Sequence, residues 1–84
     1  MVADEIKSAI KTAVPDAEVH IYDPDGQHFQ ALVISAEFEG LALVRQHQKV
    51  MKALKEAFET NVHALGLKTF TPEKWANEKQ NYGF

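Results

Sequence analysis

The chain contains no cysteine among its 84 residues. Disulfide bonds and thiol catalysis are therefore excluded, and so is an iron–sulfur or zinc site built from four thiolates of this chain alone. Any metal bound here needs His, Asp or Glu as a ligand, or thiolates supplied by a partner protein. The question of metal binding consequently falls first on the four histidines of the chain.

Long hydrophobic runs are also missing, since no apolar stretch approaches the ~20 residues that a membrane-spanning helix needs. Residues 1–5 are acidic, unlike a signal or transit peptide. Together these features predict a cytoplasmic protein with no membrane association. The formal net charge of −3 argues against an electrostatic nucleic-acid binder, because such proteins carry a basic balance or a basic face.

Catalytic motifs are lacking as well. Neither Ser8 nor Ser35 has the glycine-flanked nucleophile motif of the serine hydrolases around it, and Gly40 is not part of a Gly-x-Gly-x-x-Gly loop. No two histidines have the spacing of a local zinc motif, and the carboxylates are scattered over positions expected to be solvated. The sequence therefore predicts a protein that is not an enzyme.

What the chain does have is the composition of an ordinary globular domain, with 45% hydrophobic and 25% charged residues. A chain of this length can bury only one hydrophobic core. We therefore predict a single domain over residues 1–84.

Apolar spacing and turn residues predict six elements in an α/β order. A turn at residues 23–26 closes a hairpin between the first two strands, and Thr71 with Pro72 provides an N-cap and a first helical turn. The predicted order is helix (2–13), strand (18–23), strand (28–35), helix (43–61), strand (from residue 63) and helix (from residue 72).

Two histidines stand where the second and third predicted strands begin. A long helical crossover is the connection that adjacent parallel strands require. If the third strand pairs with the second, His28 and His63 lie at the same end of the sheet, on strands about 4.8 Å apart, and could meet at one metal or one partner surface. From the residue pattern alone, His28 fits a solvated loop position equally well, and His63 fits a polar strand start.

The other two histidines are expected to have structural or surface roles. His47 lies on the apolar stripe of the long helix, with Val44, Met51 and Leu54. We predict a packed core histidine with one ring nitrogen hydrogen-bonded. His20 alternates with Val19 on the first strand and is predicted to be a plain surface residue.

One charged feature stands out on the long helix, where Arg45, Lys49, Lys52 and Lys55 occupy the side opposite the apolar stripe. Basic residues cover exposed helices routinely, so an ordinary solvated face explains them. A contact surface for nucleic acid or for an anionic partner explains them too.

Four short motifs are distributed over the chain: Phe38-x-Gly40; Val44, His47 and Val50; Val62-His63-Ala64-Leu65; and Thr69-x-Thr71-Pro72-x-x-Trp75. Together they resemble the BolA family, and the resemblance covers essentially the whole chain. The chain looks most like the shorter bacterial branch that is associated with acid tolerance, because of residues 26–30 and 81–84.

The resemblance implies a KH-like (type II) αββαβα domain, with a three-stranded mixed sheet and helices packed mainly on one face. It also implies an adaptor that binds a monothiol glutaredoxin and shares a [2Fe-2S] cluster with it and with glutathione, in iron–sulfur trafficking or in iron, redox or acid-stress regulation. His63 matches the family's ligand position, and His28 matches a loop position where branches differ between histidine and cysteine. The isolated chain is expected to bind no cluster.

The KH resemblance suggests an alternative, a nucleic-acid-binding transcriptional regulator. KH domains clamp a nucleic-acid backbone with a Gly-x-x-Gly loop, but here Gly40 is followed by residues 41–43 without a second glycine. Gln46 and Gln48 stand where family members have arginines, so we predict weak DNA binding. Two further possibilities stay open: a small structural or assembly module that binds no cluster, and a homodimer of this chain. The expected partner or nucleic-acid surface consists of Arg45, Lys49, Lys52, Lys55 and Trp75.

Overall fold

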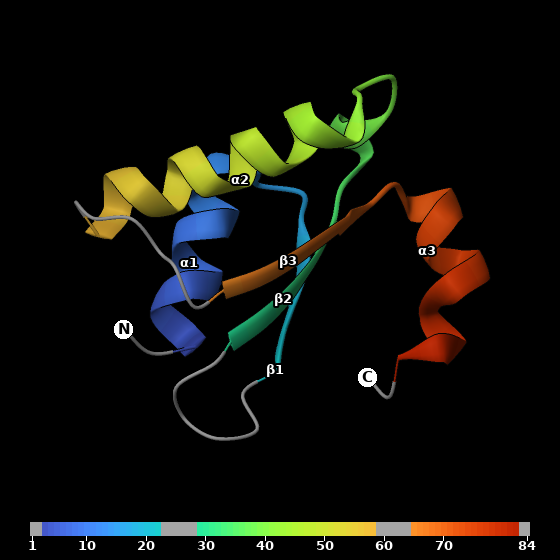
Figure 1. Cartoon of the computed structure of the whole chain (residues 1–84), viewed down its shortest axis with the longest axis horizontal. Helices are drawn as coiled ribbons and strands as arrows, with labels where there is room; N and C mark the ends of the chain where they lie inside the picture. Colours follow the sequence, from blue (N-terminus) through green and yellow to red (C-terminus); the bar gives the residue numbers. More distant parts are fainter. Residues whose placement is uncertain (1–2, 23–28, 59–64, 83–84) are drawn as a thin grey trace.

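The computed structural model describes residues 3–22, 29–58 and 65–82 of the chain (Figure 1). The helices and strands are α1 (Ala3–Ala13), β1 (Glu18–Tyr22), β2 (Phe29–Ile34), the 3-10 helix η1 (Ala36–Phe38), α2 (Leu43–Phe58), β3 (Leu65–Phe70), α3 (Pro72–Glu78) and the 3-10 helix η2 (Lys79–Asn81). This order confirms the αββαβα fold predicted from the sequence. None of the helices in the described ranges is long and apolar enough to cross a membrane.

The three strands form one mixed sheet in the order β1-β2-β3. β1 pairs antiparallel with β2, and β3 pairs parallel with β2 after the crossover through α2. Phe29 is paired with Leu65 and Ile34 with Phe70. The parallel pairing predicted from the crossover is therefore confirmed, and β2 and β3 begin at the same end of the sheet.

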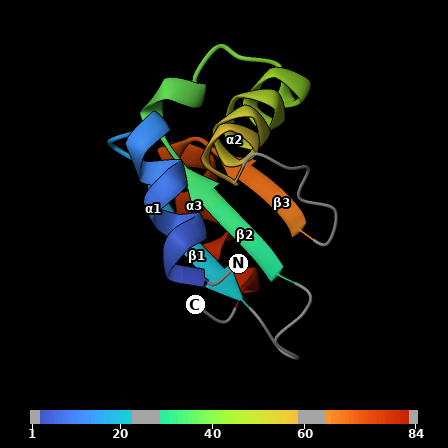
Figure 2. The same ribbon diagram turned by 90° about the vertical axis from the view of Figure 1, so that its left-hand side faces the viewer.

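The larger core lies between the sheet and the two long helices. Phe29 and Val33 point from β2 to the same face because alternate residues of a strand do so. This face is covered by α1 and α2, which contribute fully buried apolar side chains (Figure 2). The buried members of this core are Ile6, Ile10, Val14, Ala17, Val19, Phe29, Val33, Phe38, Val50 and Leu54.

The expectation of only one hydrophobic core is wrong, because both faces of the sheet are covered: a second, smaller core lies on the opposite face. The intervening β2 residues Leu32 and Ile34 pack there with Phe70 and Trp75, and α3 covers them (Figure 1). α3 begins as predicted, because the Thr71 hydroxyl accepts a hydrogen bond from the Lys74 N–H at 3.3 Å and Pro72 stands in the first turn. The two long helices thus share one face, and the short one closes the other.

A hydrogen-bonded joint connects the end of β2 to the loop after α1. The Ser35 hydroxyl donates to Asp16 Oδ1 at 2.6 Å, and the Ala36 N–H donates to Asp16 Oδ2 at 3.0 Å. Ser35 is buried, and its oxygen also accepts a hydrogen bond from the Glu37 N–H, which starts η1. The bond from the Ser35 hydroxyl lowers the pKa of the Asp16 carboxyl below its ordinary value, and the smaller opposing effect of desolvation does not reverse this.

Removal of this carboxylate should destabilise the fold. We expect Asp16→Ala to lower the free energy of unfolding by about 1–2 kcal/mol at pH 7, because the buried Ser35 hydroxyl loses its acceptor. Urea unfolding of Asp16→Ala, Ser35→Ala and the double variant measures this, and the two single losses should not add.

The pH dependence of this effect has a definite sign. A carboxyl whose pKa is lowered by folding stabilises the protein above its unfolded-state pKa, and the stabilisation is lost as the pH falls through the lowered value. The stability difference between the wild type and Asp16→Ala should therefore narrow below about pH 3.8. A difference that is absent at pH 7, or that widens in acid, would contradict this assignment.

Candidate functional site

The two candidate ligands, His28 and His63, lie outside the described residues. The described part of the chain nevertheless fixes the strands that follow them. Phe29, next to His28 in sequence, is the register partner of Leu65, which comes two residues after His63. Neighbouring strands are about 4.8 Å apart. The strand starts next to both candidates therefore share one end of the sheet.

Within residues 3–22, 29–58 and 65–82, no group of three or more His, Cys, Asp or Glu side chains is arranged to hold a metal ion. The assignment of His28 and His63 as metal ligands stays a prediction, because both lie outside the described residues.

His20 differs from its prediction as a plain surface residue. Its side chain is only 30% exposed, and its Nε2 atom lies 2.6 Å from Glu18 Oε2. The His20 ring stacks on Trp75, with the ring centroids 5.7 Å apart and an interplanar angle of 30°. Strand alternation correctly placed His20 opposite Val19, but it gave no indication that α3 covers that second face. The prediction for His20 was therefore wrong.

His47 is not a packed core histidine either. It is half-buried on the wall of a groove beside β3, and its ring has no hydrogen-bond partner among the described residues. The apolar stripe of α2 is buried only further along, at Val50 and Leu54, whereas Leu43 and Val44 are 56% and 66% exposed. The first turn of α2 is exposed, so periodicity alone overstated the length of the buried stripe.

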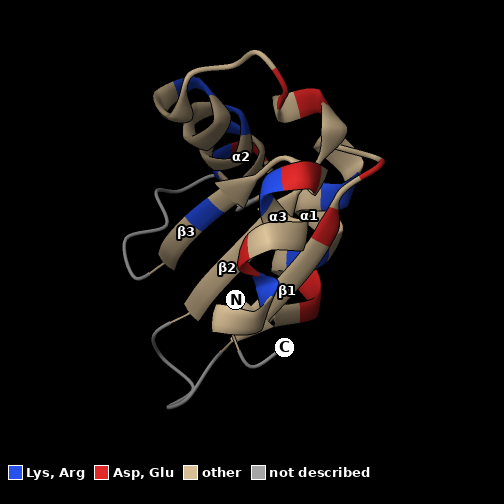
Figure 3. Ribbon diagram, turned by 90° about the vertical axis from the view of Figure 1, so that its right-hand side faces the viewer, with Lys and Arg blue, Asp and Glu red and all other residues tan. Residues whose placement is uncertain are grey.

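The basic residues of α2 form an exposed face. Arg45, Lys52 and Lys55 are exposed, and Lys49 makes an ion pair with Glu37 at 3.2 Å. Figure 3 shows basic residues on α2 and on β3. Positive charge on this side of the molecule is therefore available to an anionic partner.

Trp75 does not belong to that surface. It is 8% exposed, and its ring packs against Phe70 and Tyr82 at centroid distances of 5.2 and 5.7 Å. The expectation that Trp75 contacts a partner is corrected by this burial, because the ring is part of the core under α3. Its place in the helix sequence, three residues after Pro72, did not reveal which face it would occupy.

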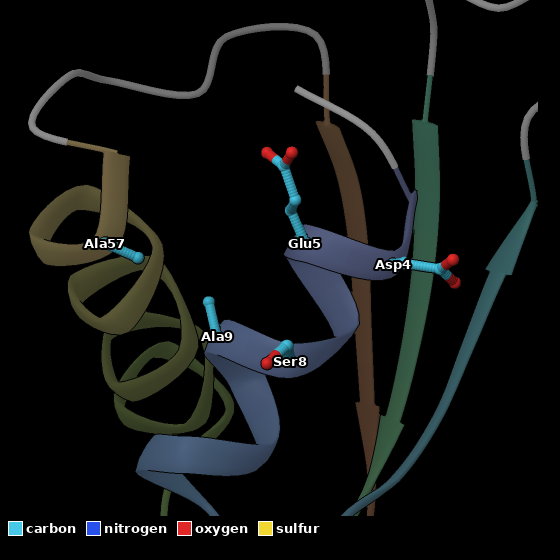
Figure 4. Close-up of a pocket in the computed structure, with 5 residues that line it drawn as sticks. All are labelled: Asp4, Glu5, Ser8, Ala9 and Ala57. Carbon is cyan, nitrogen blue, oxygen red and sulfur yellow. The ribbon is translucent and has the colours of Figure 1, made fainter.

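A shallow pocket of about 410 Å³ lies between α1 and α2 (Figure 4). Among the described residues that line it, Ser8 is the only one with a hydroxyl group, and none is a histidine. In Figure 4 the Asp4 carboxylate points away from Ser8. The described lining therefore shows no paired nucleophile and general base of the kind that hydrolytic enzymes use.

Comparison with known proteins gives the family. A sequence profile described as BolA-like protein matches residues 3–74. The chain belongs to the BolA family. It is 35% identical to the acid stress protein IbaG of Escherichia coli over 82 residues, which is 96% of each protein. It is also 36% identical over 53 residues to the DNA-binding transcriptional regulator BolA of Haemophilus influenzae, covering 63% of this chain and 52% of that protein.

Solved structures of BolA proteins have the same fold. The BolA homologue of Coxiella burnetii superposes with a TM-score of 0.74 at 34% identity, over 90% of this chain and 97% of that one. A Babesia bovis BolA-like protein, at 21% identity, superposes with a TM-score of 0.77 over 94% of each chain, which shows the shared fold.

One residue that departs from the BolA pattern has a structural role that the sequence did not reveal. The Gln46 amide donates to the Leu41 carbonyl at 2.9 Å and to the Phe38 carbonyl at 3.3 Å, and its oxygen accepts from the Thr69 hydroxyl at 2.6 Å. Gln46 thereby links the loop before α2 to β3. Gly40, at φ +79°, provides the left-handed turn in that loop.

Proposed function

We propose that this BolA-family chain is an adaptor that binds a monothiol glutaredoxin and co-ligates a [2Fe-2S] cluster held at their interface. Its role would lie in iron–sulfur trafficking or in iron, redox or acid-stress regulation. The observation that carries the proposal is the parallel register of β2 and β3, which starts both strands at one end of the sheet beside His28 and His63 in the sequence.

The donor set of the chain suits a shared cluster. A chain without cysteine cannot hold a [2Fe-2S] cluster on thiolates of its own. The glutaredoxin would supply its active-site thiolate and the thiolate of glutathione to one iron, while His63 and His28 would hold the other. Two neutral imidazoles in place of two thiolates raise the reduction potential of such a cluster, as in Rieske centres.

The chain's own contribution would be to position these imidazoles so that an unprotonated nitrogen of each can bind iron. Each ligand histidine has to present a nitrogen without a proton. The paired strand starts at Phe29 and Leu65 come one residue after His28 and two residues after His63 in the sequence. The exposed basic side chains Arg45, Lys52 and Lys55 would attract the carboxylates of glutathione or an acidic glutaredoxin surface.

The similarity to an E. coli protein named for acid stress supports a stress-related role for this chain. A histidine-ligated cluster would give such a role a chemical basis, because imidazole protonates in mildly acidic solution.

Mixing the purified chain with a glutathione-loaded monothiol glutaredoxin that carries its cluster tests the proposal. We expect the two proteins to co-elute and the visible spectrum of the cluster to change, while the chain alone acquires no cluster. The matched control is the same glutaredoxin mixed with the His63→Ala variant. An unchanged glutaredoxin spectrum without co-elution at micromolar concentrations would overturn the proposal.

A second candidate function, DNA binding, is favoured by the basic face of α2 and by the name of the H. influenzae relative. The net charge of −3 and the absence of a Gly-x-x-Gly sequence after Gly40 oppose it. We expect a dissociation constant no tighter than about 10⁻⁴ to 10⁻⁶ M at physiological salt, the range of non-specific binding. Fluorescence anisotropy with labelled duplex DNA measures it, and a sequence-specific nanomolar complex that survives about 200 mM salt would promote this function.

A further inference from the structure

We infer that the open edge of β3 binds an extended acidic peptide segment of a partner protein, which joins the sheet as a fourth strand. Among the described strands, β3 is an edge strand, since it pairs with β2 alone in the order β1-β2-β3. An edge strand presents backbone N–H and C=O groups that can pair with another chain. The inference does not rest on the cluster ligands proposed above.

A groove of about 370 Å³ follows this edge. Four consecutive residues of β3, Leu67 to Phe70, line it. Consecutive strand residues point to opposite faces of a sheet, so a groove lined by all four opens at the edge and not on one face. Its walls come from the elements that cover the two faces, and consist of Leu43 and His47 of α2 and of Lys74, Glu78 and Tyr82 from the C-terminal segment.

The direction of the backbone groups supports strand addition. The Phe70 carbonyl accepts a hydrogen bond from the Ser35 N–H at 3.1 Å, so it faces the β2 side. The N–H and C=O groups of a strand alternate between its two sides from one residue to the next. The backbone groups of Thr69 and Leu67 therefore point away from β2. Thr69 is 4% exposed, so Leu67 is the more accessible of the two positions on this edge.

The charges around the groove favour an acidic occupant. Residues 43–58 and 65–82 hold seven basic and three acidic residues, whereas residues 3–22 and 29–42 hold two basic and six acidic ones. Lys68 and Lys74 line the groove, against one acid, Glu78. Figure 3 shows the basic residues of α2 and β3 on the same side of the molecule. If two copies of this chain paired along β3, Lys68 and Lys74 of one copy would lie close to the same lysines of the other. Charge repulsion therefore disfavours self-pairing.

The apolar part of the groove fits the alternating side chains of a peptide better than nucleotide bases. Leu43 lines the groove with 56% of its surface exposed, and the adjacent Val44 is 66% exposed. Bases of single-stranded nucleic acid stack on exposed aromatic rings. Of the two described aromatic rings that line the groove, Phe70 is buried, and the half-buried Tyr82 already packs against Phe70 and Trp75. A segment that alternates acidic and apolar residues matches both the basic and the apolar contacts.

The test uses the full chain, labelled with ¹⁵N, and a capped peptide of four Glu-Val repeats followed by NMR. We expect the amide signals of Leu67 and Thr69 to shift and to become protected from hydrogen exchange, while the amides of β1 do not change. A capped peptide of four Lys-Val repeats, with the same strand propensity, should bind at least about fivefold more weakly.

Two matched pairs of variants separate backbone pairing from charge. Leu67→Pro removes an edge N–H at a position where proline is tolerated, and should weaken binding at least tenfold, whereas Leu67→Val keeps the N–H and should bind within threefold of the wild type. Lys68→Glu with Lys74→Glu should weaken binding at least about fivefold. The same double change at Lys7 and Lys11 of α1 should leave binding unchanged.

Several results would overturn the inference. Equal binding of the Glu-Val and Lys-Val peptides would show that the groove does not prefer acidic segments. Unchanged β3 amide signals with the Glu-Val peptide would show that the peptide does not bind at this edge. Shifts of those amides with oligothymidylate but not with peptide would make the groove a nucleic-acid surface. Shifts that appear on concentrating the chain alone would make it an interface between copies.

Discussion

His63→Ala should abolish the change that this chain causes in the visible spectrum of a glutaredoxin-bound [2Fe-2S] cluster. The expected loss is complete, because the variant removes one of the two imidazoles that would bind the second iron and the cysteine-free chain has no thiolate to replace it. Visible circular dichroism of the mixed proteins measures the effect, since it reports the ligands of the cluster more directly than co-elution does.

The other histidines provide a graded series of controls. His28→Ala should weaken or alter the spectrum, because a second ligand is lost while His63 remains. His20→Ala should preserve the spectrum even though it removes the stack on Trp75 and lowers stability. His47→Ala should also preserve it, because His47 is half-buried on the groove wall beside β3. If His63→Ala retains the wild-type spectrum, the ligand assignment is wrong.

Acidification should release the imidazole ligands from the complex. A free imidazole has a pKa of about 6.5, and a histidine that binds a metal has to give up the proton on its coordinating nitrogen. Protons therefore compete with iron for His28 and His63. We expect the histidine-dependent circular dichroism signal to disappear as the pH falls through roughly 6.5 to 5, in a window that lies lower the more tightly iron holds the nitrogens.

The control for this titration is the cluster on glutaredoxin alone. Its thiolate ligands should hold the cluster over the same range, so a loss confined to the mixed complex assigns the change to the imidazoles. A signal that stays flat from pH 8 to pH 5, in a complex whose spectrum depends on His63, would rule out proton competition as a regulatory mechanism.

The sequence predicted the topology well because local signals determine it. The Thr71-Pro72 start of α3, the alternation in β1 and the helical crossover before β3 each follow from a few neighbouring residues, and all three are confirmed. The parallel direction of β3 against β2 follows from the crossover, whereas the register between them could not be predicted from the sequence.

The features that the sequence missed depend on contacts between distant residues. Alternation placed His20 opposite Val19 but did not indicate that Trp75 of α3 would cover it. Helical spacing could not show where along α2 the burial of the apolar stripe begins, so His47 was expected in the core. Gln46 is paired with Thr69, which lies 23 positions away, and no local pattern indicates such a bond. The groove along β3 likewise appears only when α2 and α3 are both in place.

The central claim is that this chain contributes histidine nitrogens to an iron of the shared cluster. Pulsed electron paramagnetic resonance of the reduced complex, with ¹⁵N-histidine incorporated only into this chain, tests it most directly. The account predicts strong nitrogen couplings that change from ¹⁴N to ¹⁵N on labelling and that are lost with His63→Ala. Couplings that are absent, or that do not respond to the label, would contradict it.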